Sequence, residues 1–562
     1  MPRNNGSRAA VSRRTLLARI GWGSAAVLTM NPTIACSRPD SDGQGSGDDD
    51  ALLARILAEA EPFIGRRDEP YRITRTLLID AGKTVRIEPD TRILWAGIVQ
   101  DEARPVAVFE AAGDDTALVA AGEGEAFIES EVPSPWVYAA AMFGHRGFLV
   151  EGIAARNCQH VHVGSSVSAY EAVRTRGADS NIARDVRVQG GGARFTALPS
   201  QGNGSCMLAY VSGAHVSDAH YENVSHGVQW WGGDSGLLAW QNGARENERK
   251  CSDLLIERVS VRNATVGGIW GSMGRDIQVR DCRVEDCLDV GCNAEGCDEI
   301  TFERCTSVNG HNGCFTTFAL NDGIRFLDCQ GSVDNASYPL FRIYNVTQSN
   351  ADNRNIAVTG GSFDCLDPSG PASMDCARGP VRELAITGAR LRNVRIDTVF
   401  LNMHRTRVAD NELTFTVPLP SQEAAIRAGA SQGLPGQIGQ AIVDNNTIRY
   451  AVQPQRASGD AVAIEMVEND YNANAASQVT GNSVSGPFAV GISLVNASGN
   501  PGVVPAFEIS GNRFEGLAAT ARLLSVSREG QASEPGVRWD ASQMHDGRAV
   551  DLARALGKTR SR

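Results

Sequence analysis

Lysine is almost absent from this sequence. Of 562 residues only Lys83, Lys250 and Lys558 are lysines, and aromatic residues make up 6%. With 59 glycines, this composition suits thin layers of chain joined by tight turns. The formal net charge of -12 argues against nucleic acid as a partner, although a local basic patch could still bind an anionic polysaccharide.

Two further features are missing. No cysteines have the CxxC spacing of a zinc site, although 13 cysteines are present, so a metal held by cysteines is not expected. The weakly apolar stretch at 20–30 is too short to span a membrane. Cys365 and Cys376 bracket a loop and are the best candidates for one disulfide. The other cysteines are expected to point inward as small apolar side chains.

A short motif recurs every 23 or 24 residues in the centre of the chain. It reads DLLIERV at 253–259, DIQVRDC at 276–282, EITFERC at 299–305 and GIRFLDC at 323–329. Apolar and polar positions alternate within it, as in a half-buried strand, and no helix long enough for a βαβ unit separates the copies. Each copy can bury its apolar side only against its neighbours, which predicts a solenoid with one coil per repeat.

The sequence resembles the right-handed parallel β-helices of the pectin-lyase-like superfamily over 71–539. The resemblance rests on coil length, on cysteines at equivalent places of successive coils and on asparagine-bearing turns, namely Cys282, Cys305, Cys329, Asn411, Asn446, Asn482 and Asn512. It implies an all-β fold and a family of polysaccharide lyases, glycoside hydrolases, uronan epimerases and phage tailspikes. Because this fold hosts many chemistries, the resemblance alone does not select one.

The N-terminus is expected to be an export signal rather than part of the fold. SRRTLL at 12–17 resembles a twin-arginine motif, and TIAC at 33–36 resembles a lipobox without its leading leucine. Lipidation of Cys36 and plain cleavage of a signal at 1–36 both remain open. Export of a folded chain would also let thiols be buried before they meet an oxidising compartment.

Four segments should follow the signal. We expect a flexible linker at 37–50, a helical cap at 51–70, the β-helix at 71–539 and a polar, loose tail at 540–562. The cap is predicted from apolar residues that share one helical face, namely Leu53, Ile56, Leu57, Ala60, Phe63 and Ile64.

The second short run of each coil should supply a functional face. Taking the residue after Gly227, Gly268, Gly291 and Gly313 as inward, alternation predicts a row of outward side chains. Its members are Gln229, Trp231, Trp270, Ser272, Asn293, Glu295, Phe315, Thr317, Arg342, Tyr344, Asn402 and His404. Aromatic rings among polar groups suit a sugar, but a slip of one residue would turn each of them inward.

A loop at 232–250 directly follows one strand of this face and carries Trp240, Arg245, Arg249 and Lys250. It is the best candidate for a basic patch that contacts substrate. The alternative is a solvated loop, because Glu246 and Glu248 neutralise much of its charge.

Two sets of catalytic residues can be assembled on the face. Glu295 beside Trp270, with Asp289 as partner, would form the carboxylate pair of a glycoside hydrolase. Arg342, His311 and Tyr344 could instead neutralise a uronate, abstract its α-proton and protonate the leaving oxygen, as a lyase requires. Each residue also has a plain structural interpretation as a turn cap or a surface side chain.

Family patterns do not separate these possibilities. Some β-helix lyases use a lysine with an arginine, yet no lysine lies on the face. The polygalacturonase type carries paired aspartates on neighbouring coils, and no such pair is predicted here. Calcium is used by several relatives, and Asp289, Glu295 and Asp298 could supply oxygens, but no fixed calcium spacing requires it.

We therefore predict an exported enzyme, periplasmic or lipid-anchored to the envelope, that processes an extracellular or cell-envelope polysaccharide as a lyase or glycoside hydrolase. The alternative is a polysaccharide-binding or surface-adhesion protein without catalysis. Expected partners are the polysaccharide and the twin-arginine machinery. A lipid anchor would be the membrane contact, and the protein is expected to be a monomer or a homotrimer.

Overall fold

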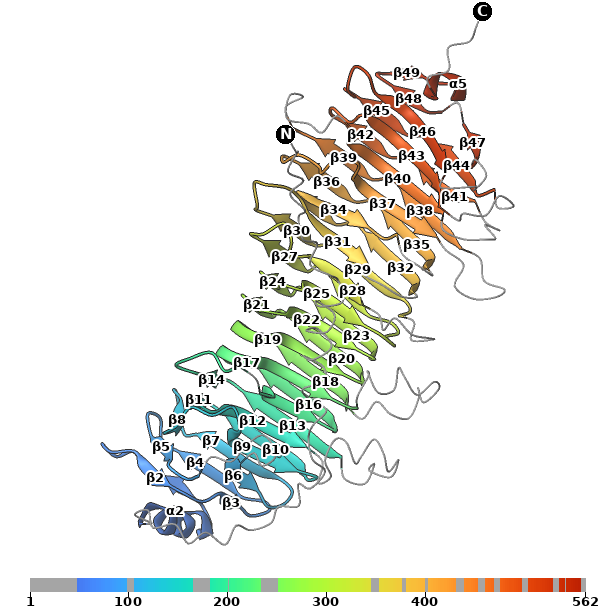
Figure 1. Cartoon of the computed structure of the whole chain (residues 1–562). Helices are drawn as coiled ribbons and strands as arrows, with labels where there is room; N and C mark the ends of the chain where they lie inside the picture. Colours follow the sequence, from blue (N-terminus) through green and yellow to red (C-terminus); the bar gives the residue numbers. More distant parts are fainter. Residues whose placement is uncertain are drawn as a thin grey trace, which may run out of the picture.

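The computed structural model describes residues 48–98, 106–164, 182–200, 202–233, 251–344, 353–376, 381–399, 403–430, 439–452, 460–468, 476–497, 504–528, 535–540 and 542–556. Over these residues the chain winds into a right-handed parallel β-helix, an elongated stack of coils seen side-on in Figure 1. The predicted fold is confirmed. Each coil contributes one strand to each of three faces, A, B and C, which follow one another along the chain.

Face A is one parallel sheet. Its strands are β1 (Phe63–Ile64), β4 (Thr84–Ile87), β7 (Thr116–Ala120), β10 (Arg146–Glu151), β13 (Ala183–Gln189), β16 (Val211–Ser217), β18 (Cys251–Glu257), β20 (Gly274–Arg280), β23 (Asp298–Glu303), β26 (Arg325–Leu327), β29 (Ile356–Thr359), β32 (Val381–Thr387), β35 (Met403–Ala409), β38 (Gln440–Asp444), β41 (Ser477–Thr480), β44 (Ala506–Ser510) and β47 (Gly536–Trp539).

Face B begins after a turn in each coil. Its strands are β2 (Tyr71–Ile73), β5 (Arg92–Trp95), β8 (Ala126–Ser130), β11 (Ile153–Arg156), β14 (Gly192–Arg194), the first parts of β17 (His220–Trp231) and β19 (Ser260–Ser272), β21 (Arg283–Glu285), β24 (Thr306–Val308), β27 (Gln330–Val333), β30 (Ser362–Cys365), β33 (Arg390–Arg392), β36 (Glu412–Phe415), β39 (Thr447–Tyr450), β42 (Ser483–Ser485), β45 (Arg513–Glu515), β48 (Met544–His545) and the antiparallel β49 (Arg548–Ala549).

Face C carries the candidate site. Its strands are β3 (Leu77–Ile79), β6 (Val106–Ala111), β9 (Val137–Phe143), β12 (Gln159–Gly164), β15 (Gly204–Ala209), the second parts of β17 and β19, β22 (Val290–Glu295), β25 (Gly313–Phe318), β28 (Phe341–Tyr344), β31 (Ala372–Cys376), β34 (Val394–Asp397), β37 (Ala424–Ala430), β40 (Val462–Glu468), β43 (Val490–Asn496) and β46 (Arg522–Arg528).

The core consists of columns of inward side chains, one from each coil. On face C, Ile269, Cys292, Phe315 and Phe341 are Cα partners in successive strands, and all four are buried. Phe326 of face A packs edge-on against two of these rings, at 5.7 Å from Phe315 and 5.4 Å from Phe341. A coil therefore buries its apolar side chains mainly against its neighbours, as the repeat predicted.

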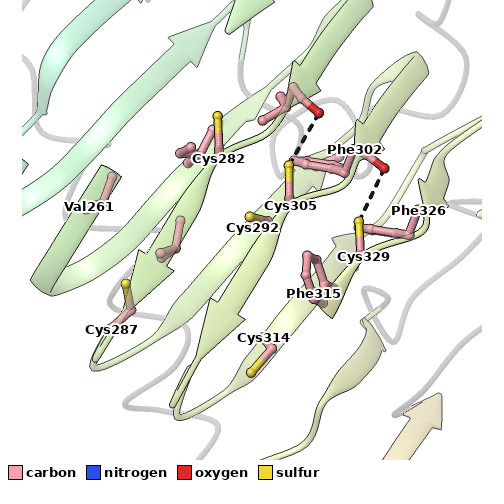
Figure 2. Packing of buried hydrophobic residues seen from close by; sticks show 14 of the residues in the cluster. Val261, Cys282, Cys287, Cys292, Phe302, Cys305, Cys314, Phe315, Phe326 and Cys329 are labelled. Atoms are coloured by element: carbon pink, nitrogen blue, oxygen red, sulfur yellow. Dashed lines mark hydrogen bonds between the residues drawn. The ribbon is translucent and has the colours of Figure 1, made fainter. Parts of the chain in front are cut away.

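The turn between faces A and B carries two side-chain ladders. In the central coils Cys282, Cys305 and Cys329 are buried there. The thiols of Cys305 and Cys329 bond to carbonyl oxygens one coil earlier, both at 3.4 Å (Figure 2). In the later coils the side chains of Asn411, Asn446, Asn482 and Asn512 bond to one another in sequence, each at 2.9 Å. These asparagines are structural, as predicted.

Helix α2 (Asp48–Ala58) covers the first coil, with Leu53 and Leu57 in the core. The helix was predicted to continue to residue 64, but it ends at Ala58 because Pro62 disfavours its continuation. Phe63 and Ile64 form strand β1 instead. No helix among the described residues is long and apolar enough to cross a membrane.

The last coil is also covered, at the far end of the stack in Figure 1. Helix α5 (Leu552–Ala555) follows β49, Val550 and Ala555 are buried, and the Trp539 Nε1–H donates to the Val550 carbonyl oxygen at 2.8 Å. The prediction of a loose polar tail is therefore wrong for 542–556, where a few apolar side chains close the end of the core.

Cys365 is a buried free thiol, so the predicted disulfide with Cys376 is also wrong. The two cysteines lie in strands of different faces, β30 and β31. Cys365 bonds through sulfur to the Gly370 carbonyl oxygen at 3.6 Å.

Candidate functional site

The outward side chains of face C form two adjacent rows along the solenoid axis. Neighbouring Cα atoms within a row are separated by about 4.8 Å, the spacing between paired strands. The main row contains Gln229, Trp270, Asn293, Thr316, Arg342, Asp375, Asp397, Arg427 and Glu465. The side row contains Trp231, Ser272, Glu295, Phe318 and Tyr344.

The Trp270 cluster comprises His226, Trp270, Ser272, Asn293 and Glu295. The Glu295 carboxylate accepts hydrogen bonds from the Ser272 hydroxyl at 2.9 Å and from the Asn293 amide nitrogen at 3.0 Å. His226 stacks on Trp270 with ring centroids 5.2 Å apart. Strands β17, β19 and β22 thus bring together four of the predicted outward residues, Trp270, Ser272, Asn293 and Glu295.

Trp270 does not present an open ring to a sugar. It is only 8% exposed, and one face of its indole is occupied by His226. The half-buried Trp231, in the side row one coil earlier, is the more accessible of the two tryptophans. Trp270 therefore contributes a polar N–H group more readily than a stacking surface.

The Arg342 cluster comprises Asp289, Asn312, Arg342, Tyr344 and Asp375. Arg342 binds both carboxylate oxygens of Asp375, at 3.0 and 3.1 Å, and donates to the Tyr344 hydroxyl at 2.7 Å. Tyr344 donates to the Asn312 carbonyl oxygen at 3.1 Å, and the Asn312 amide donates to Asp289 at 2.6 Å. One chain of hydrogen bonds and ion pairs therefore connects the two carboxylates through a tyrosine and an arginine.

Electrostatics distinguishes the two carboxylates of this cluster. Burial raises the pKa of Asp289, and the Asn312 hydrogen bond and His311 lower it only in part. Burial also raises the pKa of Tyr344; Arg342 opposes that shift, whereas Asp289 and Asp375 both add to it. The charges of two different carboxyl groups, Asp289 and the arginine-bound Asp375, therefore act on the Tyr344 hydroxyl.

A third group, the Arg427 cluster, continues the main row. Arg427 lies 2.7 Å from Glu465 and 3.7 Å from Asp397, and Arg395 lies 2.8 Å from Glu423 and 3.8 Å from Asp397. Asp397 is also the Cα partner of Asp375. A pair of aspartates on neighbouring coils therefore exists, although none was predicted.

Sequence reasoning missed Asp375 and Asp397 for different reasons. Asp375 lies in β31, within the segment between Cys365 and Cys376 that the sequence predicts to be a loop. Asp397 ends β34, where Val394 and Ile396 alternate with Arg395 and Asp397. That alternation was a signal from which the second aspartate could have been found.

Phe315 and Thr317 point into the core and do not belong to the site, which corrects the prediction for both. They pair with Cys292 and Ala294, and the outward residues of this strand are Thr316 and Phe318. The predicted register is wrong by one residue because Gly313 pairs with Val290, so that Cys314 stands where earlier coils have Gly268 and Gly291.

The glycine position has a steric cause. A Cβ on Gly268 would lie 2.2 Å from the Val284 side chain, and a Cβ on Gly291 would lie 2.1 Å from Ser307. One coil later the residue aligned with Val284 and Ser307 is Gly331. Because Gly331 has no side chain, the position opposite it can hold Cys314. In this coil the glycine that the tight contact requires is therefore in β27 rather than at the equivalent position of β25.

Asp289 and Glu295 belong to different clusters. Asp289 immediately precedes β22 and is bonded by Asn312, whereas Glu295 ends β22 and is bonded by Ser272 and Asn293. The structure therefore does not bring these carboxylates together as the predicted pair. Asp289 is connected instead through Asn312 to Tyr344, and through Tyr344 to Arg342. The lyase alternative had grouped Tyr344 and Arg342 with His311.

The predicted histidines have different outcomes. The His311 ring stacks on Tyr338 at 4.3 Å and lies near enough to Asp289 to act on its charge. His404 belongs to β35 of face A, so its assignment to the functional face is wrong. The face C strands before and after β35 are β34, in the preceding coil, and β37, in the same coil. Arg245, Lys250, Asn402 and Cys36 lie outside the described residues.

Among the residues that the structure describes, no three His, Cys, Asp or Glu side chains are grouped so that they could hold a metal ion. The oxygens proposed for calcium are divided as well, since Asp289 and Glu295 lie in separate clusters.

No protein-family model matches this sequence, and no curated protein matches it. Similar solved structures include the Dettilon tailspike protein gp208, with a TM-score of 0.33, 11% identity, and 75% of this chain and 66% of that chain covered. The catalytic unit of the GH87 alpha-1,3-glucanase from Streptomyces thermodiastaticus strain HF3-3 has a TM-score of 0.31 and 10% identity, with 93% of this chain and 72% of that chain covered. The surface adhesin PfbA of Streptococcus pneumoniae has a TM-score of 0.30 and 9% identity, with 87% of this chain and 91% of that chain covered. Similarities this low do not support an inference about function.

Proposed function

We propose that this protein hydrolyses a polysaccharide on face C. The Arg342 cluster is the reactive centre, with Asp289 as general acid and Asp375 as the carboxylate that acts as base or nucleophile. The observation that carries the proposal is the pair of carboxyl groups whose charges both act on the Tyr344 hydroxyl, one with its pKa raised by burial and the other bound by Arg342.

The two environments suit the two roles. A general acid must hold its proton near the working pH, and burial favours the neutral form of Asp289. The second group must be ionised, and Asp375 is bound at both oxygens by a guanidinium. Pairs of carboxyl groups with opposite environments are the requirement for cleaving a glycosidic bond. Side-chain exposures of 23% for Arg342 and 22% for Asp375 leave the centre open to a ligand.

Elimination is less well supported. A lyase needs a cation available to the uronate carboxylate, but Arg342 already pairs with Asp375. Within the described part of face C, Arg395 and Arg427 are paired with carboxylates as well. At the Arg342 cluster the ion pair with Asp375 would have to break before Arg342 could neutralise a uronate, which favours hydrolysis over elimination at this centre.

The test follows reducing ends and the absorbance of a new conjugated double bond together, across neutral and uronate-containing polysaccharides. We expect new ends without absorbance. Asp289→Asn and Asp375→Asn should each lower turnover by about 10²- to 10⁴-fold, because each removes an acid or base. Asp364→Asn, which changes a half-buried carboxylate on face B, is the matched control and should retain activity.

Other outcomes are informative. Absorbance that rises with the ends would assign elimination and overturn the roles given to Asp289 and Asp375. Full activity in both aspartate variants would place the reaction elsewhere. Polysaccharide binding without any cleavage by the unmodified protein would leave an adhesion or binding protein as the function.

We also propose that the protein is exported by the twin-arginine pathway to the periplasm or envelope. The support is the SRRTLL motif at 12–17 and the TIAC sequence at 33–36. Replacing Arg13 and Arg14 by lysine should retain the precursor in the cytoplasm, as cell fractionation would reveal. Cys36→Ala should release the protein from the membrane fraction if Cys36 is lipidated.

A further inference from the structure

Three polar atoms of the Trp270 cluster have no hydrogen-bond partner. They are His226 Nε2, Trp270 Nε1 and Asn293 Oδ1. The three residues are 4%, 8% and 4% exposed, respectively. An unpaired polar atom in such a buried position is costly, and native structures contain few of them. Their concentration in three successive coils of one face calls for a partner that supplies the missing bonds.

Their position separates them from unpaired atoms in the core. Among the described tryptophans, Trp95 and Trp230 also have an unpaired indole N–H, but both side chains belong to the apolar core. Trp270 and Asn293 are Cα partners on the outward main row, next to the half-buried Trp231 and Glu295 of the side row. A ligand on face C would approach the unpaired atoms from that side.

The hydrogen-bonding character of each atom can be assigned. Ser225 donates its only hydroxyl proton to the Gly202 carbonyl oxygen, at 2.7 Å, so His226 Nδ1–H must donate to the Ser225 oxygen, at 2.9 Å. Burial lowers the pKa of His226 to about 3, so the ring is neutral and its Nε2 is an acceptor.

The other two atoms have fixed roles. The Asn293 amide nitrogen donates to the Glu295 carboxylate, which can only accept, so Asn293 Oδ1 is the free acceptor. An indole N–H can only donate. The cluster therefore offers two acceptors and one donor.

We propose that His226, Trp270 and Asn293 form a binding subsite for an uncharged, hydroxyl-bearing sugar residue. Hydroxyl groups both donate and accept, so neighbouring hydroxyls on one sugar ring can satisfy two acceptors and one donor at once. A carboxylate or sulfate has no proton to give and would face the nearby Glu295 carboxylate. An ammonium group would leave the Trp270 N–H unpaired.

This inference rests on the proposed function and narrows it, because it makes the substrate a polysaccharide that is neutral where it contacts this subsite. It agrees with the ion pairs already made by Arg342 and Arg427, the two arginines of the main row. It does not require the chain to be cleaved, so binding and turnover can fail independently.

The test measures binding to immobilised neutral polysaccharides (glucans, xylans and galactans) and to polygalacturonate and alginate, using Asp375→Asn so that turnover does not interfere. We expect binding to a neutral polymer, reduced at least tenfold by Trp270→Phe, which keeps the ring and removes the N–H. Trp95→Phe makes the same change in the core and should leave binding unchanged. Asn293→Ala is the second variant, should Trp270→Phe not fold.

The melting temperature distinguishes binding from a structural role. Trp270→Phe should not lower it, because an unpaired donor is removed. Binding confined to the acidic polymers, binding to none of these polymers, or neutral binding that is insensitive to both variants would overturn the subsite. Sensitive neutral binding by a protein that never cleaves the polymer would instead overturn the proposed hydrolysis alone.

Discussion

Asp289 illustrates how one side chain can be unfavourable for stability and useful for chemistry. Asp289 is half-buried, burial raises the pKa of its carboxyl group, and the Asn312 amide donates to it at 2.6 Å. At neutral pH the carboxylate form carries a desolvation cost that a neutral side chain of the same shape would not carry. Perturbed carboxyl groups of this kind are concentrated at functional sites.

The first prediction concerns Asp289→Asn and the dependence of stability on pH. Because the folded-state pKa of Asp289 is raised, the native protein binds this proton more tightly than the unfolded chain does. Its contribution is therefore fully present below the ordinary aspartate pKa, about 3.9, and is lost as pH rises through the folded-state pKa. Asparagine has no such dependence.

We therefore expect Asp289→Asn to melt at the same temperature as the unmodified protein in strong acid and at a higher temperature at neutral pH. Melting curves at several pH values measure the difference. Activity should fall in the same variant, so stability and turnover move in opposite directions. A variant that is less stable at neutral pH would contradict the interpretation of Asp289 as a half-buried carboxyl group whose charged form destabilises the fold.

At the scale of the element, the ladders fix how each turn is built. In the asparagine ladder the Asn482 side chain accepts from the backbone N–H and the amide of Asn446, at 2.9 Å each, and donates to the Val443 carbonyl oxygen at 3.0 Å. The side chain replaces backbone bonds that the turn cannot make, and all of these groups are buried.

The second prediction follows from this arrangement. Asn482→Ala removes the acceptor of the buried Asn446 backbone N–H and the side-chain donor to the Val443 carbonyl oxygen, and each lost bond costs about 1–3 kcal/mol. We expect faster amide hydrogen exchange in β39, β42 and β45, measured by mass spectrometry, while β4 to β10 are unaffected because each coil contacts only its neighbours. Ser483→Ala, an exposed change beside it, is the matched control.

Equal protection of the later strands in the Asn482 and Ser483 variants would mean that the ladder adds little. An exchange increase spread evenly along the whole chain would contradict the nearest-neighbour picture of the solenoid. The experiment therefore tests the ladder and the independence of distant coils together.

At the scale of the whole molecule, the thiols are a consequence of the stacked core. The described residues include eleven free cysteines, and all of them are buried. Burial raises the pKa of Cys287 and Cys314, the second to about 11, which suppresses the reactive thiolate. Several thiols lie in neighbouring coils, as Figure 2 shows for the central part.

The third prediction is that these eleven thiols react only when the protein unfolds. An alkylating reagent at neutral pH should leave them unlabelled in the native protein and label them in denaturant, as peptide mass spectrometry would measure. Refolding under oxidising conditions should give a lower yield than refolding with a reductant, because neighbouring thiols would form non-native disulfides.

Rapid labelling of Cys282, Cys305 or Cys329 in the native protein would show that the central coils open readily. Equal refolding yields with and without reductant would remove the physical reason for folding before the chain meets an oxidising compartment. Either result would weaken the case for export in the folded state.

The sequence by itself determined the solenoid, its period, the buried cysteines and the asparagine ladder, because each follows from local alternation repeated at a fixed spacing. It also placed Trp270, Asn293, Glu295, Arg342 and Tyr344 on one face, since a strand alternates its side chains regardless of what surrounds it.

Only the tertiary structure decided the register at β25. Cys314 can replace the glycine of earlier coils there because Gly331 lies opposite it, and this depends on which strands pack together. The same holds for the partners within the face: Asp289 and Glu295 are six positions apart in sequence yet lie in different clusters, and Asp375 meets Arg342 from 33 positions away. Such contacts are set by the stacking of coils, which sequence spacing alone does not encode.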